Sequence, residues 1–305
     1  MARKNRFIPQ GGALVEVTCR TLQSMYLLTP SQELNEIIVG ILARAQRRHP
    51  VRVCGLTFMS NHFHLILEVD DAEQLTRFMH LVGSKLGKEI ARHTGWREKI
   101  FGRRYHAIVI TEEEAAQVER LRYVLRHGVK EGLVASPLDW PGVHCAAALI
   151  RGEALHGWWY DRTREGCARR RGEDFTKHQY ATAETLELTA LPCWRHLSPE
   201  EYRHRIAEMV AAIETEAEHA RRCGGREVLG VAGVMAENRR NAPAQQKRSP
   251  APAFHAATRQ ARQELREAYA EFMKEYREAS ARLRSGDRTA VFPAGSFPPA
   301  LPFVR

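Results

Sequence analysis

Four short segments in the first 110 residues alternate apolar and polar positions with a period of two, which is typical of strands that bury one face. They cover residues 13–20, 54–59, 62–69 and 105–110. The second and third segments are separated only by Ser60-Asn61, so we expect consecutive strands joined by a turn there.

Segments with apolar residues at the helical period lie between and after these strands. Thr29-Pro-Ser-Gln32 is predicted to form a capping box, with proline at the first helical position. A second helix is predicted from about Ala72. Thr111-Glu-Glu-Glu114 is predicted to cap a third, which runs to about Gly128. The resulting order is a split βαββαβ pattern. It predicts an α+β fold with a ferredoxin-like antiparallel sheet, helices on one face and the other face open.

This regular pattern ends after about residue 141, and the rest of the chain predicts a mainly helical C-terminal extension. We therefore expect a first domain over 6–145, an irregular or helical extension over 146–237 and a linker over 238–254. An amphipathic helix over 255–290 and a proline-rich tail over 291–305 follow.

The composition of the chain indicates a class of binding partner and a cellular compartment. The chain has 305 residues and a formal net charge of +10, which favours nucleic acid over a membrane surface as the partner, although the same charge is compatible with mere solubility. Its six cysteines contain no Cys-x-x-Cys pair, which argues against a zinc ribbon or a disulfide framework and fits a reducing cytoplasm. No apolar run approaches the length of a membrane span, so we expect a cytoplasmic protein with no membrane partner.

His62 and His64 are the first candidates for chemistry. Side chains alternate along a strand, so these two imidazoles share one face and lie side by side, ready to bind one cation. A lone His-x-His is a weak signal, because a metal normally needs at least three protein ligands.

A second candidate group lies in the predicted third helix, which carries an apolar stripe that includes Leu121 and Leu125. A step of about 100° per residue places Tyr123 and His127 on nearly the opposite side. Their neighbours Arg120, Arg126 and Lys130 are basic. A helical tyrosine usually packs in a core, but a tyrosine hydroxyl on a basic, potentially metal-bearing surface is a candidate nucleophile.

Four segments in the same order give the chain a family resemblance. They are Gly11-Gly-Ala-Leu-Val-Glu-Val-Thr-Cys-Arg20, Phe58-Met-Ser-Asn-His-Phe-His-Leu-Ile-Leu67, Phe101-Gly-Arg-Arg-Tyr105 and Tyr123-Val-Leu-Arg-His-Gly-Val-Lys-Glu-Gly-Leu-Val134. Together they resemble the single-tyrosine HUH transposases (IS200-like), most closely the branch associated with bacterial repetitive extragenic palindromes (REP). The resemblance covers about residues 6–145, and its most specific part is the Asn-His-x-His block.

The resemblance implies a role for each matching position. His62 and His64 would hold a divalent cation, Mg²⁺ or Mn²⁺, and Tyr123 would be the nucleophile. The third ligand would come from His127, where the family usually has Asn or Gln. A third imidazole is a softer donor than Mg²⁺ prefers and biases the site towards Mn²⁺, or towards Zn²⁺ and inactivity. The residues expected to contact DNA phosphates are Arg103, Arg104, Arg122, Arg126 and Lys130.

The implied activity is that of a DNA transposase, a single-strand endonuclease that nicks and rejoins hairpin-associated DNA through a 5′-phosphotyrosine. The expected partner is single-stranded or hairpin DNA, the expected location is the cytoplasm at the nucleoid, and the chain would act as a monomer or homodimer. Here Val-Leu-Arg-His-Gly128 follows the tyrosine, where that branch usually has Ile-His-x-Asn-Pro. Two alternatives therefore stay open: a catalytically inactive nucleic-acid-binding protein, and a metal-dependent phosphodiesterase that uses water.

Overall fold

The computed structural model describes residues 5–225, 227–244 and 253–300. Its centre is a five-stranded sheet with the order β2-β3-β1-β4-β7. The bounds of these strands are β1 Ala13–Arg20, β2 Arg52–Phe58, β3 His62–Val69, β4 His106–Ile110 and β7 Phe254–His255. Neighbours among the first four strands are antiparallel, and the short β7 adds to the edge parallel to β4. The predicted ferredoxin-like α+β fold is confirmed.

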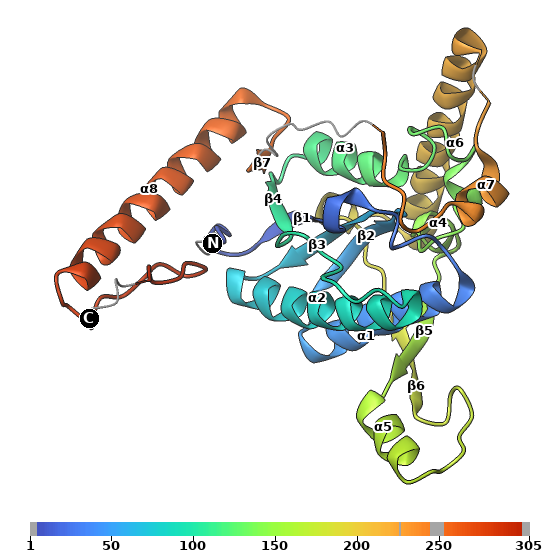
Figure 1. Cartoon of the computed structure of the whole chain (residues 1–305). Coiled ribbons are helices and arrows are strands. Elements are labelled where there is room, and N and C mark those ends of the chain that lie inside the picture. The colour runs from blue at the N-terminus through green and yellow to red at the C-terminus, as the bar shows by residue number, and fades with distance from the viewer. Residues whose placement is uncertain (1–4, 226, 245–252, 301–305) are drawn as a thin grey trace.

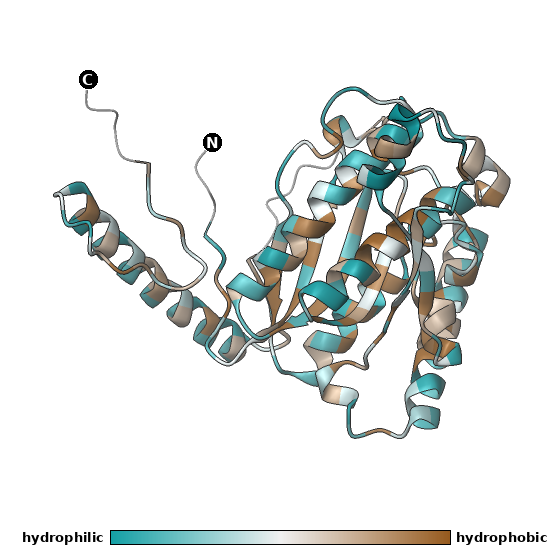
Figure 2. Ribbon diagram, turned by 90° about the horizontal axis from the view of Figure 1, so that it is seen from below, coloured by the Kyte–Doolittle hydropathy of each residue, from teal (hydrophilic) through white to brown (hydrophobic). Residues whose placement is uncertain are grey.

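Two long helices, α1 (Gln32–Arg48) and α2 (Ala72–Thr94), cover one face of this sheet (Figure 1). The other face is not open as predicted, because α3 (Glu114–Leu125) lies across it and contacts β2, β3 and β4. Apolar side chains are buried on both faces; for example, Leu65 and Ile66 are adjacent in β3 and both are almost fully buried. Figure 2 shows apolar residues on the helix sides that face the sheet.

The helix starts differ from the predicted caps. The cap of α1 is Ser31, whose hydroxyl accepts the backbone N–H of Leu34 at 3.3 Å, so Pro30 precedes the helix and does not open it. The residue before α3 is Glu113, and it makes no side-chain cap. Thr111 donates its hydroxyl to the Glu113 carboxylate at 2.8 Å. The Thr111 hydroxyl is therefore bonded to a side chain and does not cap the free backbone amides of the helix.

The second half of the chain contains more than the irregular and helical structure expected there. Strands β5 (Leu155–Tyr160) and β6 (Ala181–Leu186) form an antiparallel hairpin that packs on α1. Within the described residues the other helices are α4 Ala146–Arg151, α5 Arg162–Arg170, α6 Pro199–Gly224, α7 Gly230–Ala236 and α8 Arg259–Arg284. Short 3-10 turns cover Leu22–Ser24, Pro137–Asp139 and Pro192–Trp194.

The predicted C-terminal amphipathic helix is α8, and it extends away from the sheet domain (Figure 1). It contacts the body through Phe272 in its middle, whose ring centroid lies 5.5 Å from that of Phe7. The Phe7 ring also lies 6.0 Å from Phe254 of β7. Further along, Tyr276 contacts Phe292 of the tail at 5.9 Å. Part of the predicted linker, 245–252, and the end of the predicted tail, 301–305, lie outside the described residues. None of the helices within the described ranges is long and apolar enough to span a membrane.

Candidate metal and nucleophile site

β3 places His62 and His64 at the end of the sheet where α3 finishes. The strand lies between β1 and β2, and His64 is opposite Thr18 on one side and Thr57 on the other. The turn before β3 is fixed by Asn61, whose carbonyl accepts the Thr21 N–H at 2.9 Å. Two strand partners and a pinned turn therefore hold the pair in place.

The other two candidates come from the end of α3 and the turn beyond it. Tyr123 lies in the last turn of the helix, which ends at Leu125. His127 is not on the helix as predicted. It lies in the turn that follows, just before Gly128 at φ +88°. A residue with a Cβ would be strained at that angle, so glycine permits the reversal that keeps His127 against the sheet.

All four candidate side chains meet at one point. The ring centroids of His64 and His127 are 4.4 Å apart, those of His62 and His64 are 5.0 Å apart, and those of His62 and His127 are 5.6 Å apart. The ligand nitrogens of the three histidines lie within 4.8 Å of one another. Tyr123 packs edge-on against His127 at 4.7 Å and against His64 at 5.6 Å between centroids. We call these three histidines the histidine triad.

Hydrogen bonds at the far side of two rings leave their Nε2 atoms available. His64 Nδ1 lies 2.6 Å from Glu16 Oε1, and because a carboxylate only accepts, His64 donates its Nδ1 proton. His62 Nδ1 lies 2.6 Å from Asn61 Oδ1. The Asn61 amide is oriented by its own Nδ2, which donates to the Ser24 carbonyl at 3.2 Å. Metal-bound histidines are typically held in this way, with the second ring nitrogen donating to an oxygen.

His127 differs, because its buried Nδ1 has no hydrogen-bond partner in the described part of the chain. A buried polar atom without a partner is rare. With the two oriented Nε2 atoms, one ring nitrogen of His127 completes a set of three nitrogen donors, and these residues fit a divalent cation that accepts imidazole ligands, such as Mn²⁺ or Zn²⁺.

Burial keeps the triad neutral. It lowers the pKa of His64 and of His127 to about 3, with Arg20 and Lys130 adding to the effect at His64 and with His64 adding to it at His127. The pKa of His62 is also lowered well below its usual value, first by burial and then by the neighbouring histidines. Neutral imidazoles offer lone pairs at pH 7, which is the form that binds a metal.

Glu16 and Arg120 connect the nucleophile candidate to the triad, and the sequence pattern did not single out Glu16. The Glu16 side chain is 1% exposed, and its second oxygen pairs with the Arg120 guanidinium. That guanidinium lies 4.3 Å from the centre of the Tyr123 ring. The sequence feature that could have identified Glu16 is a carboxylate inside the apolar run Leu14-Val15-Glu16-Val17, since a charge in a buried strand needs partners.

The five predicted phosphate contacts separate into three groups. Arg126 and Lys130 both lie 5.2 Å from the Tyr123 ring centre. Arg122 instead pairs with Glu216 of α6 at 2.5 Å. Arg103 and Arg104 are exposed before β4, and within the described residues they make no hydrogen bond, ion pair or ring contact with the triad or the tyrosine.

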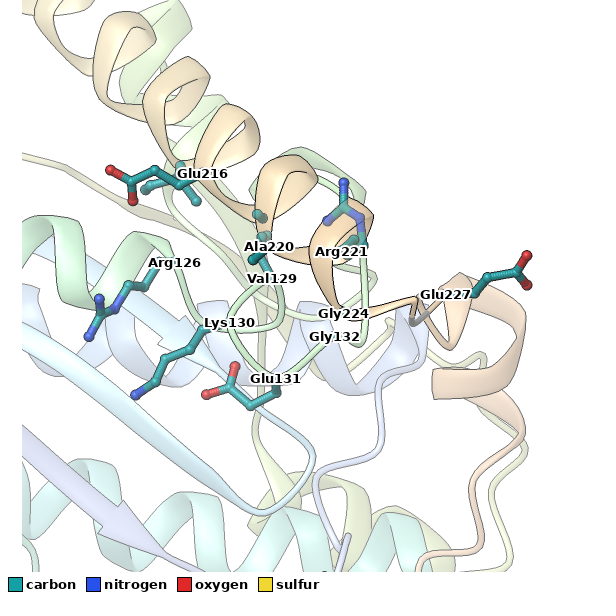
Figure 3. Close-up of a pocket in the computed structure, with 12 residues that line it drawn as sticks. Arg126, Val129, Lys130, Glu131, Gly132, Glu216, Ala220, Arg221, Gly224 and Glu227 are labelled. Carbon is teal, nitrogen blue, oxygen red and sulfur yellow. The ribbon is translucent and has the colours of Figure 1, made fainter.

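A pocket of about 600 Å³ opens beside this site, between the turn after α3 and helix α6 (Figure 3). Arg126 and Lys130 belong to its wall and also flank the Tyr123 ring, so the pocket and the tyrosine are neighbours. Its apolar floor includes Ile213 and Ala217 of α6. One guanidinium nitrogen of Arg221, which also lines it, is buried with no partner in the described residues.

Comparisons with solved structures find structural likenesses, among them two transposases. No family model and no curated protein matches the chain. A structure of the REP-associated tyrosine transposase bound to a REP hairpin is similar over 50% of this chain and 86% of that one, with 18% identity and a TM-score of 0.39. A proposed transposase from Deinococcus radiodurans R1 is similar over 39% of this chain and 94% of its own, with 13% identity and a TM-score of 0.29. At these values the likenesses carry no functional argument, which rests on the site geometry.

Proposed function

We propose that this chain is a metal-dependent enzyme that nicks and rejoins single-stranded, hairpin-associated DNA, as a transposase does, through a covalent tyrosine intermediate. The observation that carries the proposal is the convergence of three neutral imidazoles on one point beside a tyrosine ringed by cations. All of these side chains come from one chain, so the proposal needs no second copy of the chain to supply a ligand or the nucleophile.

In this proposal Nε2 of His62, Nε2 of His64 and His127 hold the cation. When bound, the cation acts as a Lewis acid on the scissile phosphate and neutralises charge that develops on its oxygens. Glu16 and Asn61 fix the orientation of two of the rings. Three imidazoles favour Mn²⁺ over the harder Mg²⁺, which prefers oxygen ligands.

Tyr123 is the proposed nucleophile. Its hydroxyl gives its proton to solvent, and the resulting oxyanion attacks phosphorus and forms a 5′-phosphotyrosine while the P–O3′ bond breaks. The departing 3′ oxygen takes a proton from solvent and becomes a free 3′-OH. The reverse attack by a 3′-OH of a second strand releases Tyr123, so strand transfer needs no external energy source.

The cations around the tyrosine position the strand. Arg126 and Lys130 would bind phosphates next to the scissile one, since both lie between the tyrosine and the 600 Å³ pocket. The nucleotide that follows the scissile phosphate would then lie in that pocket, with its base against the apolar floor and near the unpartnered nitrogen of Arg221. Arg122 would serve mainly to hold α6 through Glu216.

The test is a nicking assay on single-stranded DNA flanked by a hairpin, with Mn²⁺ or Mg²⁺, analysed on a denaturing gel for cleaved strand and for protein–DNA adduct. The proposal predicts metal-dependent cleavage with a covalent adduct. Cleavage without adduct would support the water-using phosphodiesterase. Binding without cleavage would support an inactive nucleic-acid-binding protein, the alternative that the altered segment after Tyr123 favours.

A further inference from the structure

A second cavity lies on the side of the sheet that α1 and α2 cover, opposite the histidine triad. It has a volume of about 210 Å³ and lies where the β5–β6 hairpin and α5 meet α1 and α2. Its wall combines the run Trp158-Trp159-Tyr160 with basic residues of α2. None of these residues takes part in the proposed nicking reaction.

The hairpin is held tightly against α1, so the cavity has a fixed frame. A Cβ added to Gly157 would meet the Glu36 carbonyl oxygen at 2.3 Å, and one added to Gly40 would meet the Trp158 carbonyl oxygen at 2.2 Å. Only glycines allow such backbone contact. The hairpin is also tied by Glu184 of β6, which pairs with Arg44 of α1 at 2.7 Å.

The three aromatic side chains of the wall are half-buried, and one of them carries a polar atom without a hydrogen-bond partner in the described residues. Trp158 stacks on His178 with centroids 4.4 Å apart and an interplanar angle of 24°. The Tyr160 hydroxyl is buried and has no hydrogen-bond partner within the described residues. A run of three half-buried aromatics on a docked hairpin is more than the hairpin needs to bury its own face.

The basic wall presents charge to the same space. Lys85, Lys88 and Arg92 are spaced by three and four residues, so they share one face of α2. The acidic residue among them, Glu89, is neutralised by Arg162, whose Nη2 and Nε lie 2.5 and 3.0 Å from its Oε2, and by Arg92, whose Nη1 lies 3.2 Å from its Oε1. The Lys85 ammonium lies 4.9 Å from the Trp159 ring centre. Neither lysine pairs with a carboxylate in the part of the chain that the structure describes. The Arg162 guanidinium lies 4.3 Å from the Tyr160 ring centre, so Lys85 and Arg162 both cover aromatic rings and must turn aside when a base enters.

We propose that this cavity binds one unpaired nucleotide of a single-stranded nucleic acid, with its base against Trp159 and Tyr160 and its phosphate on Lys85 and Lys88. Aromatic platforms beside lysines are how proteins bind single strands without reading sequence. The volume is below the roughly 300–1,000 Å³ of sites for drug-sized ligands, so it suits one base. A duplex is excluded as the ligand, because its bases are stacked internally and cannot reach the wall.

Photo-crosslinking of the full-length protein tests this site without relying on the proposed catalysis. The probe is a short oligothymidine carrying one 5-iododeoxyuridine, and a chelator is present so that no metal-dependent step contributes. Mass spectrometry of the digested protein locates the crosslink. We expect a crosslinked peptide that contains Trp159 and Tyr160. A crosslink confined to peptides outside residues 155–163 would overturn the proposal.

Affinity measurements with matched charge changes provide the second arm. In the variant Lys85→Glu/Lys88→Glu we expect the Kd for the same oligonucleotide to rise by about tenfold or more, because the phosphate contacts and the cationic rim are lost. The control Arg48→Glu/Arg77→Glu changes the net charge equally at exposed positions of α1 and α2 outside the cavity, and we expect a smaller rise. Equal losses in both variants would show non-specific charge attraction and contradict the site.

A competition experiment separates nucleotides from other anions. Adenosine monophosphate should displace the oligonucleotide from the wild-type protein, whereas inorganic phosphate at the same concentration should not, because it has no base to stack. Displacement by an acidic peptide without displacement by the nucleotide would point to a protein partner and overturn the proposal.

Discussion

Replacing Glu16 by glutamine tests whether the buried carboxylate orients the histidine triad. The variant keeps the size of the side chain and one oxygen that can accept the His64 Nδ1 proton, but it removes the negative charge. In the native protein this charge accepts from His64 at 2.6 Å and pairs with Arg120. The perturbation therefore acts behind a ligand and not on the metal itself.

The expected magnitude follows from the strength of the bond that changes. A hydrogen bond to a charged group contributes about 1.5–3 kcal/mol and a neutral one about 0.5–1.5 kcal/mol, so the loss is about 1–1.5 kcal/mol. That corresponds to about tenfold weaker metal binding, at the lower end of the roughly 10–100-fold range for residues that orient metal ligands. Arg120 also loses its buried partner, and we expect a lower free energy of unfolding, by about 3 kcal/mol.

The assay is calorimetric titration of the metal-free protein with Mn²⁺, at a temperature where circular dichroism shows both proteins folded. Glu68→Gln is the matched control. Glu68 lies on the same strand as His64 and pairs with Arg52 at 2.7 Å and with Arg195, but it contacts no member of the triad. We expect its Mn²⁺ affinity to match that of the wild type. Unchanged affinity in folded Glu16→Gln, or an equal loss in Glu68→Gln, would refute the orienting role.

Three further predictions concern the third ligand, acid stability and the hairpin. His127→Asn replaces a nitrogen donor by an oxygen donor, so the ratio of Mg²⁺-supported to Mn²⁺-supported nicking should rise, and an unchanged ratio would argue against His127 as a ligand. Burial lowers the pKa of His144 to about 4. The unfolded chain therefore binds a proton at this position more tightly, and the free energy of unfolding falls as the pH falls from about 6.5 to 4. In denaturant titrations His144→Asn should remove up to about 3 kcal/mol of this decrease. Gly157→Ala should lower the free energy of unfolding by about 1–3 kcal/mol, because its Cβ meets the Glu36 carbonyl oxygen at 2.3 Å, whereas Gly166→Ala on α5 should not.

The sheet domain was predictable because its burial follows the periodicity of its sequence. The alternation over 62–69 placed Phe63 in the core and His64 on the opposite face, and the structure has both there. The histidine pair could be found for the same reason. The β5–β6 hairpin was missed because Trp158-Trp159-Tyr160 does not alternate, and its packing depends on close backbone contact at Gly157.

The rest of the site depends on long-range contacts that a periodic pattern does not contain. Helical geometry placed His127 on α3, but the helix ends at Leu125 and the turn at Gly128 brings the imidazole to the sheet. Glu16 is 104 residues from Arg120 and 48 from His64. The antiparallel pairing of β1 with β3 brings Glu16 to His64, and the packing of α3 across the sheet brings Arg120 to Glu16. A carboxylate in an apolar strand can be recognised in the sequence, but the tertiary fold determines which residues are its partners.

Adduct formation by Tyr123→Phe tests the central claim most directly. Wild-type protein, Tyr123→Phe and the control Tyr105→Phe are incubated with hairpin-flanked single-stranded DNA and Mn²⁺, and the adduct is measured on a denaturing gel and mapped by mass spectrometry. We predict an adduct on the peptide containing Tyr123 in the wild type and in Tyr105→Phe, and none in Tyr123→Phe, since the variant lacks only the attacking oxygen. An adduct of normal yield in Tyr123→Phe would contradict the account.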